Sequence, residues 1–147
     1  MISIITPLLD EEGYVKPFLV HLREVEGDFE LIMVDGGSND GTLMEVEKFR
    51  NEFDRGFKLL EYSRGRAIQM NKGAQVACGD ILLFLHVDCF IPKDSLKLIE
   101  NEIYEKKNIG GGFRQAFSKP DIFLRFASAF GNLRAKFTRT SGNCGKP

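Results

Sequence analysis

The chain has 147 residues, of which 43% are hydrophobic and 28% are charged, and its formal net charge is −1. These values suit one globular domain with a sizeable core and exclude a disordered chain. No apolar run approaches the roughly 20 residues that a membrane span needs. The acidic start MISIITPLLDEE also lacks the basic region of a secretory signal. We therefore predict a single cytoplasmic domain over residues 1–147, with Cys78, Cys89 and Cys144 as reduced thiols.

The charges are unevenly distributed along the chain. Up to Glu105 there are 11 basic and 20 acidic residues, whereas from Lys106 onward there are 9 basic residues and one acid, Asp121. Two explanations stay open at this stage. The basic end either packs against acidic surface elsewhere or faces phosphate groups or an anionic membrane.

The first elements alternate between strand and helix. Residues 3–9 (SIITPLL) are apolar and β-branched, which predicts a strand. Residues 11–23 predict a helix, although Pro17 would interrupt it if it lies beyond the first turn. Residues 29–34 (FELIMV) predict a second strand, which runs into the densest turn cluster of the chain, DGGSNDGT.

The middle of the chain continues this alternation. Residues 42–53 have helical spacing, residues 57–61 suggest a short strand, and residues 66–77 predict another helix. The apolar run at 81–85 (ILLFL) predicts a strand that is buried on both faces.

The last third adds three more predicted elements. They are a helix over residues 93–105, a strand over 110–117 and a helix over 121–137 with a broad apolar face. Basic side chains follow that face as far as Arg139. The face either covers the core or a dimer partner, or lies on a membrane surface near a lipid-linked acceptor.

Strands that alternate with helices predict an α/β fold with a mainly parallel sheet flanked by helices. In such sheets, ligands bind outside the carboxyl ends of the strands. A polar cluster follows each of four predicted strands, and we expect these clusters to share one site: residues 10–12, 35–40, 64–66 and 86–88.

The first cluster argues against a dinucleotide fold, and the second offers a ligand contact. The first strand is followed by Asp10, Glu11 and Glu12 rather than by a glycine-rich loop, and these acids would repel a pyrophosphate. Acidic side chains can instead accept hydrogen bonds from a base or a ribose. Asp35 is placed for that role, or it is a turn residue that stabilises the corner after the second strand.

The third cluster is basic. Arg64 and Arg66 lie at the start of a predicted helix, where guanidinium groups and free backbone N–H groups together form an anion site. The alternative is a solvated loop. Gln69 lies on the same helix and either contacts the ligand or is a surface residue.

The fourth cluster ends the most apolar stretch of the chain, GDILLFLHVDCF, with His86 and Asp88. A carboxylate at the end of a buried strand must be a helix cap, an ion-pair partner or a metal ligand. A divalent cation between Asp88 and a diphosphate would neutralise both, and Mg²⁺ or Mn²⁺ suits such oxygen ligands. His86 is a second ligand, a hydrogen-bond partner of phosphate or only a polar strand end.

Five pieces of sequence in this order carry a resemblance: Pro7, DEE at 10–12, VDGGSNDGT, SRGRAIQMNKGA and GDILLFLHVD. With them the chain resembles the family-2 glycosyltransferases of GT-A (Rossmann-like) fold. It is most similar to the prokaryotic subgroup that has a His-x-Asp form of the usual Asp-x-Asp motif. The resemblance extends from residue 1 to about residue 142, nearly the whole chain.

The resemblance implies a nucleotide-sugar donor, with a UDP-sugar as the default because UDP is the commonest donor nucleotide in the family. It also implies a divalent cation, Mn²⁺ or Mg²⁺, at Asp88, with His86 in place of the first aspartate of the motif. By position, Glu11 and Asp35 correspond to nucleoside contacts. The other expected nucleotide contacts are Pro7, Arg64, Arg66 and Gln69.

The resemblance breaks down near the end of the chain. Family members have a Gly-Asp-Gln stretch whose aspartate is the expected general base, and here Asn143 stands at that place. An amide cannot act as a base near neutral pH. Family members also continue for several more elements, so we expect the acceptor side to be truncated and the catalytic base to be unknown.

Three functions follow from these patterns. The first is an inverting, metal-assisted glycosyltransferase with an unknown acceptor and without a nucleic-acid partner. It would be cytoplasmic or peripheral at the inner membrane surface, and a homodimer is an option. The second is a domain that binds a nucleotide-sugar without catalysis. The third is a nucleotidyltransferase, against which the missing glycine-rich phosphate loop counts.

Overall fold

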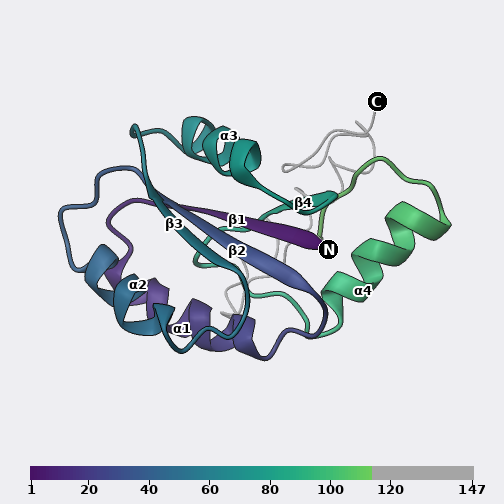
Figure 1. Ribbon diagram of the computed structural model, residues 1–147, viewed down its shortest axis with the longest axis horizontal. Coiled ribbons are helices and arrows are strands. Elements are labelled where there is room, and N and C mark those ends of the chain that lie inside the picture. The colour runs from purple at the N-terminus through teal and green to yellow at the C-terminus, as the bar shows by residue number, and fades with distance from the viewer. Residues whose placement is uncertain (114–147) are drawn as a thin grey trace, which may run out of the picture. The chain divides into compact units, whose positions relative to one another are not determined.

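The centre of the structure is a sheet of four strands in the order β3-β2-β1-β4 (Figure 1). The computed structural model describes residues 1–113 of the chain. All three strand pairings are parallel, so the predicted α/β fold with a parallel sheet is confirmed. The strands are β1 (Ile2–Leu8), β2 (Phe29–Asp35), β3 (Phe57–Glu61) and β4 (Ile81–Phe84).

Helices cover both faces of this sheet. In Figure 1, α1 and α2 lie on one face and α3 lies on the other. A helix of six residues, α4, follows β4 and continues directly into a π-helix. The bounds are α1 (Glu12–Arg23), α2 (Thr42–Arg50), α3 (Arg66–Val76), α4 (Ser95–Glu100) and η1 (Asn101–Glu105).

The core is built around the two central strands. All seven residues of β1 and all seven of β2 are buried, as β-branched and apolar strands between two helical layers should be. On the α3 side, Ile5, Ile32 and Val34 form the centre of this packing. Helix α3 approaches closely because it has Gly73 there: a Cβ at that position would lie 2.5 Å from Cγ2 of Ile5.

Three sequence predictions differ from the structure. Helix α1 runs through Pro17, because a missing N–H at one position does not outweigh its buried apolar face. Strand β4 is not buried on both faces: within residues 1–113 it pairs with β1 alone, and Leu82 is 42% exposed. The predicted helix at 93–105 changes at Asn101, whose carbonyl accepts an i→i+5 hydrogen bond from the N–H of Lys106 at 3.2 Å.

The amino end of the sheet holds one buried carboxylate, Glu30, which is 6% exposed. It accepts hydrogen bonds from the Ser3 hydroxyl at 2.6 Å, the Cys78 backbone N–H at 2.5 Å and the Lys58 ammonium at 2.9 Å. Burial acts to raise the pKa of Glu30, but these bonds outweigh it and lower the pKa to about 2. The network joins β1, β2 and β3 through one charged group.

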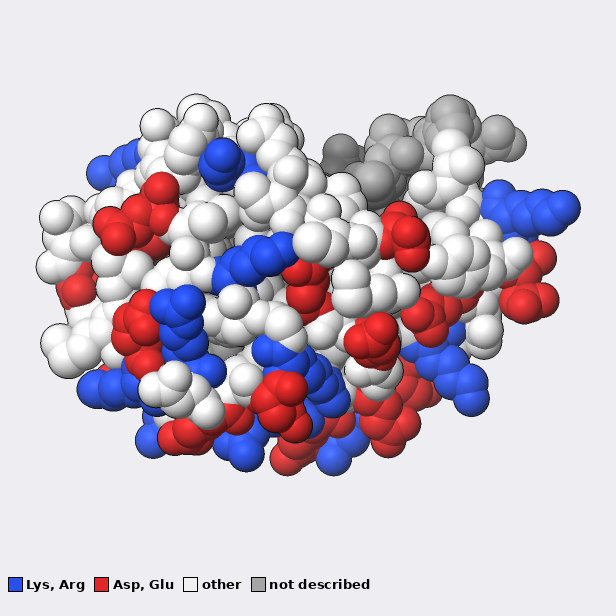
Figure 2. Space-filling model, viewed as in Figure 1, with Lys and Arg blue, Asp and Glu red and all other residues white. Residues whose placement is uncertain are grey.

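Charges of both signs are interspersed on the surface. Figure 2 shows Lys and Arg next to Asp and Glu over much of one face. Exposed ion pairs around α1 and α2, such as Arg23–Glu52 and Arg50–Glu47, account for part of this pattern. Such pairs contribute little to stability, about 0 to 1 kcal/mol each.

The chain divides into two units, Met1–Leu98 and Ile99–Pro147. The elements that form the sheet all belong to the first unit, and the prediction of a single domain stays a prediction. Residues 110–113 have no regular secondary structure, and the rest of the predicted strand at 110–117 lies outside the described residues. The predicted helix at 121–137, Cys144 and Asn143 lie outside them as well.

Candidate functional site

The strand order creates a topological switch point between β1 and β4. From β1 the chain adds β2 and β3 on one side of the sheet, and then returns to place β4 on the other side of β1. Ligands of parallel α/β proteins bind outside the carboxyl ends of the strands at such a point. Two of the predicted clusters, residues 10–12 and 86–88, follow these two strands directly.

Pro7 explains why β1 and β4 stop pairing before this point. The last hydrogen bond between them runs from the N–H of Leu85 to the carbonyl of Ile5 at 3.0 Å. Peptide groups two residues apart face the same neighbouring strand, so the next group of β1 to face β4 belongs to Pro7. Pro7 has no N–H and cannot continue the ladder. The two strands therefore separate at their carboxyl ends without leaving a donor unpaired at Pro7.

Charged side chains from three segments lie within electrostatic range of one another beyond the ends of these strands. Glu11 precedes α1, Arg66 begins α3, and Asp88 lies in the turn after β4. Burial raises the pKa of the Glu11 carboxyl, and the negative charges of Asp88 and Asp40 raise it further, whereas Arg66 lowers it. These three residues come from three of the clusters that the sequence predicted to share one site, and the structure places them near one another.

His86 belongs to the same group of side chains. It is partly buried, and burial lowers its pKa; the positive charge of Arg66 acts in the same direction and Asp88 opposes it. The imidazole is therefore neutral near pH 7 and has a lone pair to offer. Asp88 is exposed, and the turn that carries it is closed by a hydrogen bond from the Cys89 N–H to the His86 carbonyl at 3.0 Å.

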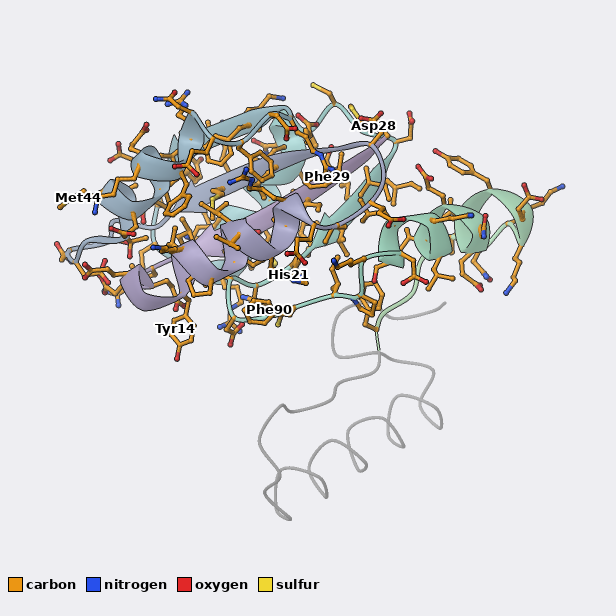
Figure 3. The ribbon with its side chains drawn as sticks, turned by 90° about the horizontal axis from the view of Figure 1, so that it is seen from below. Tyr14, His21, Asp28, Phe29, Met44 and Phe90 are labelled. Atoms are coloured by element: carbon orange, nitrogen blue, oxygen red, sulfur yellow. The ribbon has the colours of Figure 1, made fainter. Side chains whose placement is uncertain are left out.

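The segment that follows Asp88 is held by helix α1. Nε2 of His21 lies 2.8 Å from the carbonyl oxygen of Ile91, and the imidazole meets the ring of Phe90 edge-on with centroids 5.0 Å apart. Figure 3 shows His21 and Phe90 side by side at α1. This histidine was not predicted to have a role, and no local sequence pattern identifies it, because its partners are 70 residues away.

Asp35 ends β2 and is fully buried. Its Oδ2 accepts hydrogen bonds from the backbone N–H groups of Gly37 and Ser38 at 2.8 and 2.9 Å, and its Oδ1 accepts one from the Ser38 hydroxyl at 2.5 Å. This is the turn-stabilising arrangement that the sequence left open as an alternative. A contact between Asp35 and a nucleoside stays a prediction.

The two arginines of the third cluster are both exposed at the start of α3, as an anion site requires. Gln69, in contrast, is 3% exposed, so it is not a surface residue. Its Nε2 donates hydrogen bonds to the carbonyls of Leu8 at 2.6 Å and Val34 at 2.7 Å. Ligand contacts of Arg64, Arg66 and Gln69 stay predictions.

Hydrogen bonds connect the loop before α1 to the loop before α2. The Thr42 hydroxyl accepts one from the Glu11 N–H at 2.7 Å and donates one to the Asp40 carboxylate. The Asn39 N–H donates to Oδ1 of Asp10 at 2.8 Å, and the Asp10 N–H donates to the Ser38 hydroxyl at 3.0 Å. These bonds fix the backbone that carries Glu11.

Sequence reasoning missed the role of Thr42. The sequence predicted only that Thr42 begins a helix at the end of the DGGSNDGT stretch. A hydroxyl residue directly after a turn cluster was the available signal, but nothing local shows that its partner is 31 residues earlier in the chain.

A divalent cation was predicted at Asp88 and His86. Among the described residues, no group of three or more His, Cys, Asp and Glu side chains is arranged to hold a metal ion. Mg²⁺ and Mn²⁺ are commonly held by one or two carboxylates together with phosphate oxygens of the substrate. An exposed carboxylate and a neutral imidazole, with Arg66 nearby, fit such a shared site better than a cage made of protein ligands alone.

The described part of the chain has no helix that is both long and apolar enough to cross a membrane.

Fold and site together define an α/β protein with carboxylates, a histidine and an arginine near the switch point of its sheet. The chain belongs to glycosyl transferase family 2, whose family model matches residues 3–145. It is 36% identical over 106 residues to the uncharacterized glycosyltransferase YfnE of Bacillus subtilis. This match covers 68% of the chain and 27% of YfnE, so the chain spans about a quarter of that relative's length.

Solved structures agree on the GT-A fold, as predicted. The mannosyltransferase PcManGT of Pyrobaculum calidifontis, in complex with GDP-Man and Mn²⁺, superimposes with a TM-score of 0.67 at 24% identity, over 70% of this chain and 32% of that one. TarS 1-349 of S. aureus, in complex with UDP-GlcNAc, gives a TM-score of 0.61 at 28% identity, over 80% of this chain and 37% of that one.

Proposed function

We propose that the protein is a glycosyltransferase that moves a sugar from a nucleoside-diphosphate donor to an acceptor hydroxyl. The observation that carries this proposal is that Glu11, Arg66, His86 and Asp88 lie within electrostatic range of one another at the switch point between β1 and β4. Membership of glycosyl transferase family 2 supports it. So do the GDP-Man and UDP-GlcNAc complexes of two proteins of the same fold.

The nucleoside half of the donor would lie against the ends of β1 and β2. Pro7, Glu11 and Asp35 border that region. The acidic character of the loop at 10–12 suits hydrogen bonds with hydroxyl and N–H groups of a ribose and a base, since carboxylates accept such bonds. A UDP-sugar remains the default donor.

The diphosphate would lie between Arg66 and Asp88, with the exposed Arg64 as a further cationic contact. A guanidinium binds phosphate oxygens directly, whereas a carboxylate needs a cation between itself and the phosphate. Asp88 and, beside it, His86 would hold Mn²⁺ or Mg²⁺. When bound, the cation supplies Lewis-acid stabilisation of the negative charge on the leaving diphosphate.

In the proposed reaction the acceptor hydroxyl attacks the anomeric carbon from the face opposite the diphosphate, which inverts its configuration. The bond from the anomeric carbon to the diphosphate oxygen breaks, and Arg66 compensates part of the charge that develops there. The group that takes the hydroxyl proton is unassigned, because Asn143 cannot accept it.

The test is thermal unfolding of the full chain with UDP or GDP, each with and without Mn²⁺. A ligand at about 100 times its dissociation constant adds roughly 2.7 kcal/mol to stability. We expect a Mn²⁺-dependent stabilisation by one nucleotide, which Asp88→Asn abolishes. Asp80→Asn is the matched control, because Asp80 is an exposed aspartate that precedes β4 rather than following it. Equal stabilisation of the wild type and Asp88→Asn would remove Asp88 from the site.

Binding without catalysis is the second candidate, and Asn143 in place of the expected base favours it. The two functions differ in turnover. Release of free sugar from the donor that binds best would be measured for the wild type and for Asp88→Asn. Slow release by the wild type that Asp88→Asn lacks would exclude a purely binding role. Tight binding with no release of nucleoside diphosphate over many hours would favour it.

A further inference from the structure

One amide group ties helix α3 to the ends of both central strands. Gln69 lies in the first turn of α3, and its Nε2 donates to the carbonyls of Leu8 and Val34 at 2.6 and 2.7 Å. Leu8 is the last residue of β1 and Val34 is the last but one of β2. A terminal amide has two N–H donors, so these two bonds use both of them.

The surrounding backbone is shaped for this contact. The Leu8 carbonyl also accepts the N–H of Gly36 at 2.9 Å, so the Gln69 amide takes its second lone pair. A Cβ at Gly36 would lie 3.0 Å from Nε2 of Gln69. Glycine at position 36 therefore leaves the space that the amide occupies.

Fixing Gln69 also fixes the first turn of α3. Its backbone N–H donates to the carbonyl of Gly65 at 2.9 Å. Gly65 has φ of +135°, a conformation that a residue with a side chain rarely adopts, and it turns the chain into the helix. Arg66 follows directly, one helical turn before Gln69, and its positive charge acts on both Glu11 and His86.

We propose that Gln69 is a positioning residue of the nucleotide site: its two N–H donors hold Arg66 at the carboxyl ends of β1 and β4, where the guanidinium meets the diphosphate. This inference rests on the proposed function and deepens it. In this role Gln69 acts through its bonds to the two strand ends rather than through the predicted contact with the nucleotide. This role explains why a polar amide is buried at the ends of β1 and β2, which already pair with each other through their backbones.

Two variants of one helix test this role in the full chain. Gln69→Met keeps the length of the side chain and removes both donors. Gln75→Met makes the same chemical change at an exposed position of α3 and is the matched control. We also expect Gln69→Met to destabilise the fold. Val25→Ala therefore serves as a stability control, because Val25 is fully buried and precedes β2 at the amino end of the sheet.

The first measurement is the affinity for UDP and GDP with Mn²⁺, by calorimetry at a temperature where all variants are folded. We expect roughly 10-fold weaker binding by Gln69→Met and wild-type binding by the two controls. If Gln69 acts through Arg66, the double variant with Arg66→Gln binds no more weakly than Arg66→Gln alone. Wild-type affinity of Gln69→Met, or losses that multiply in the double variant, would overturn the inference.

The second measurement needs no ligand and separates the two proposals. Hydrogen exchange at the backbone amide of residue 69, which donates to the Gly65 carbonyl and closes the first turn of α3, should be faster in Gln69→Met than the same amide in Gln75→Met or Val25→Ala. Unchanged exchange overturns the positioning role whether or not a nucleotide binds. If the wild type binds neither nucleotide, the proposed function fails, while faster exchange would still show that Gln69 holds the turn that carries Arg66.

Discussion

The Thr42 hydroxyl accepts a hydrogen bond from the backbone N–H of Glu11 at 2.7 Å and so joins the loop after β1 to the start of α2. Thr42 is fully buried, and its hydroxyl also donates to Asp40, so the group both gives and receives a bond. This contact fixes the backbone of Glu11, from which its carboxylate side chain extends toward the candidate site.

Thr42→Val should lower the free energy of unfolding by about 1–2 kcal/mol, because valine has the same shape but leaves the Glu11 N–H without its acceptor. Urea unfolding measures this difference. Thr42→Ser keeps the hydroxyl and should recover most of the loss. A valine variant as stable as the wild type would show that water replaces the hydroxyl without cost.

Two glycine-to-alanine changes should have opposite effects. At Gly73 a Cβ would lie 2.5 Å from Ile5 and 3.4 Å from Val34, so Gly73→Ala forces α3 away from the sheet and should cost about 1–3 kcal/mol. At Gly13, in the first turn of α1, nothing lies within 4 Å of the added methyl group. Gly13→Ala should therefore stabilise the protein by about 0.4–1 kcal/mol. Thermal unfolding of the two variants compares them, and equal destabilisation would contradict the packing seen at α3.

Stability should fall at acid pH because of Glu30. Its pKa is about 2 in the folded protein and 4.5 in the reference state, so its contribution is fully present above pH 4.5 and is lost as the pH falls toward 2. The shift corresponds to about 3 kcal/mol. Glu30→Gln should be less stable at pH 7 and should lack this part of the pH dependence.

Urea unfolding between pH 2 and pH 7 would show the difference. The control is Glu24→Gln, because Glu24 pairs with Lys93 at 3.0 Å on the exposed surface and should leave the acid dependence almost unchanged. If Glu30→Gln follows the same pH curve as the wild type, other carboxylates cause the loss.

His21 should control the order of the segment after Asp88. His21→Phe keeps a ring beside Phe90 but removes the hydrogen bond to Ile91. We expect amide exchange at residues 89–91 to become roughly 10-fold faster. Exchange at the amides of β1 in the same sample is the internal reference. An unchanged rate at residues 89–91 would mean that packing of Phe90 alone holds the segment.

The sheet could be predicted from sequence because its strands carry strong local signals. Most residues of β1 and β2 are apolar, and several are β-branched. The predicted bounds of these strands differ from the observed ones by no more than one residue at either end. Strand β4 shows the limit of such patterns: four consecutive apolar residues read the same at a sheet edge as at its centre, so the exposure of Leu82 was not foreseen.

The grouping of the site could be predicted for a similar reason, since the ends of parallel strands meet at one edge. The role of each side chain could not be predicted in this way. Gln69 and Thr42 take partners 61 and 31 residues away in the chain, and only the packing of α3 and α2 on the sheet determines those partners. Polar residues on helices look alike in sequence whether they face solvent or a strand end.

The Glu30 network and the candidate site lie at opposite ends of one strand, and that separation weakens the electrostatic coupling between them. Glu30 and Asp35 are five residues apart on β2, which corresponds to roughly 17 Å. Ionic screening in cells acts over about 8 Å. Changes of exposed charge at the amino ends of the strands can therefore adjust acid tolerance with little effect on the field at the proposed nucleotide site. A laboratory selection for stability could therefore change charged residues at one end of the sheet with little effect on the proposed site at the other end.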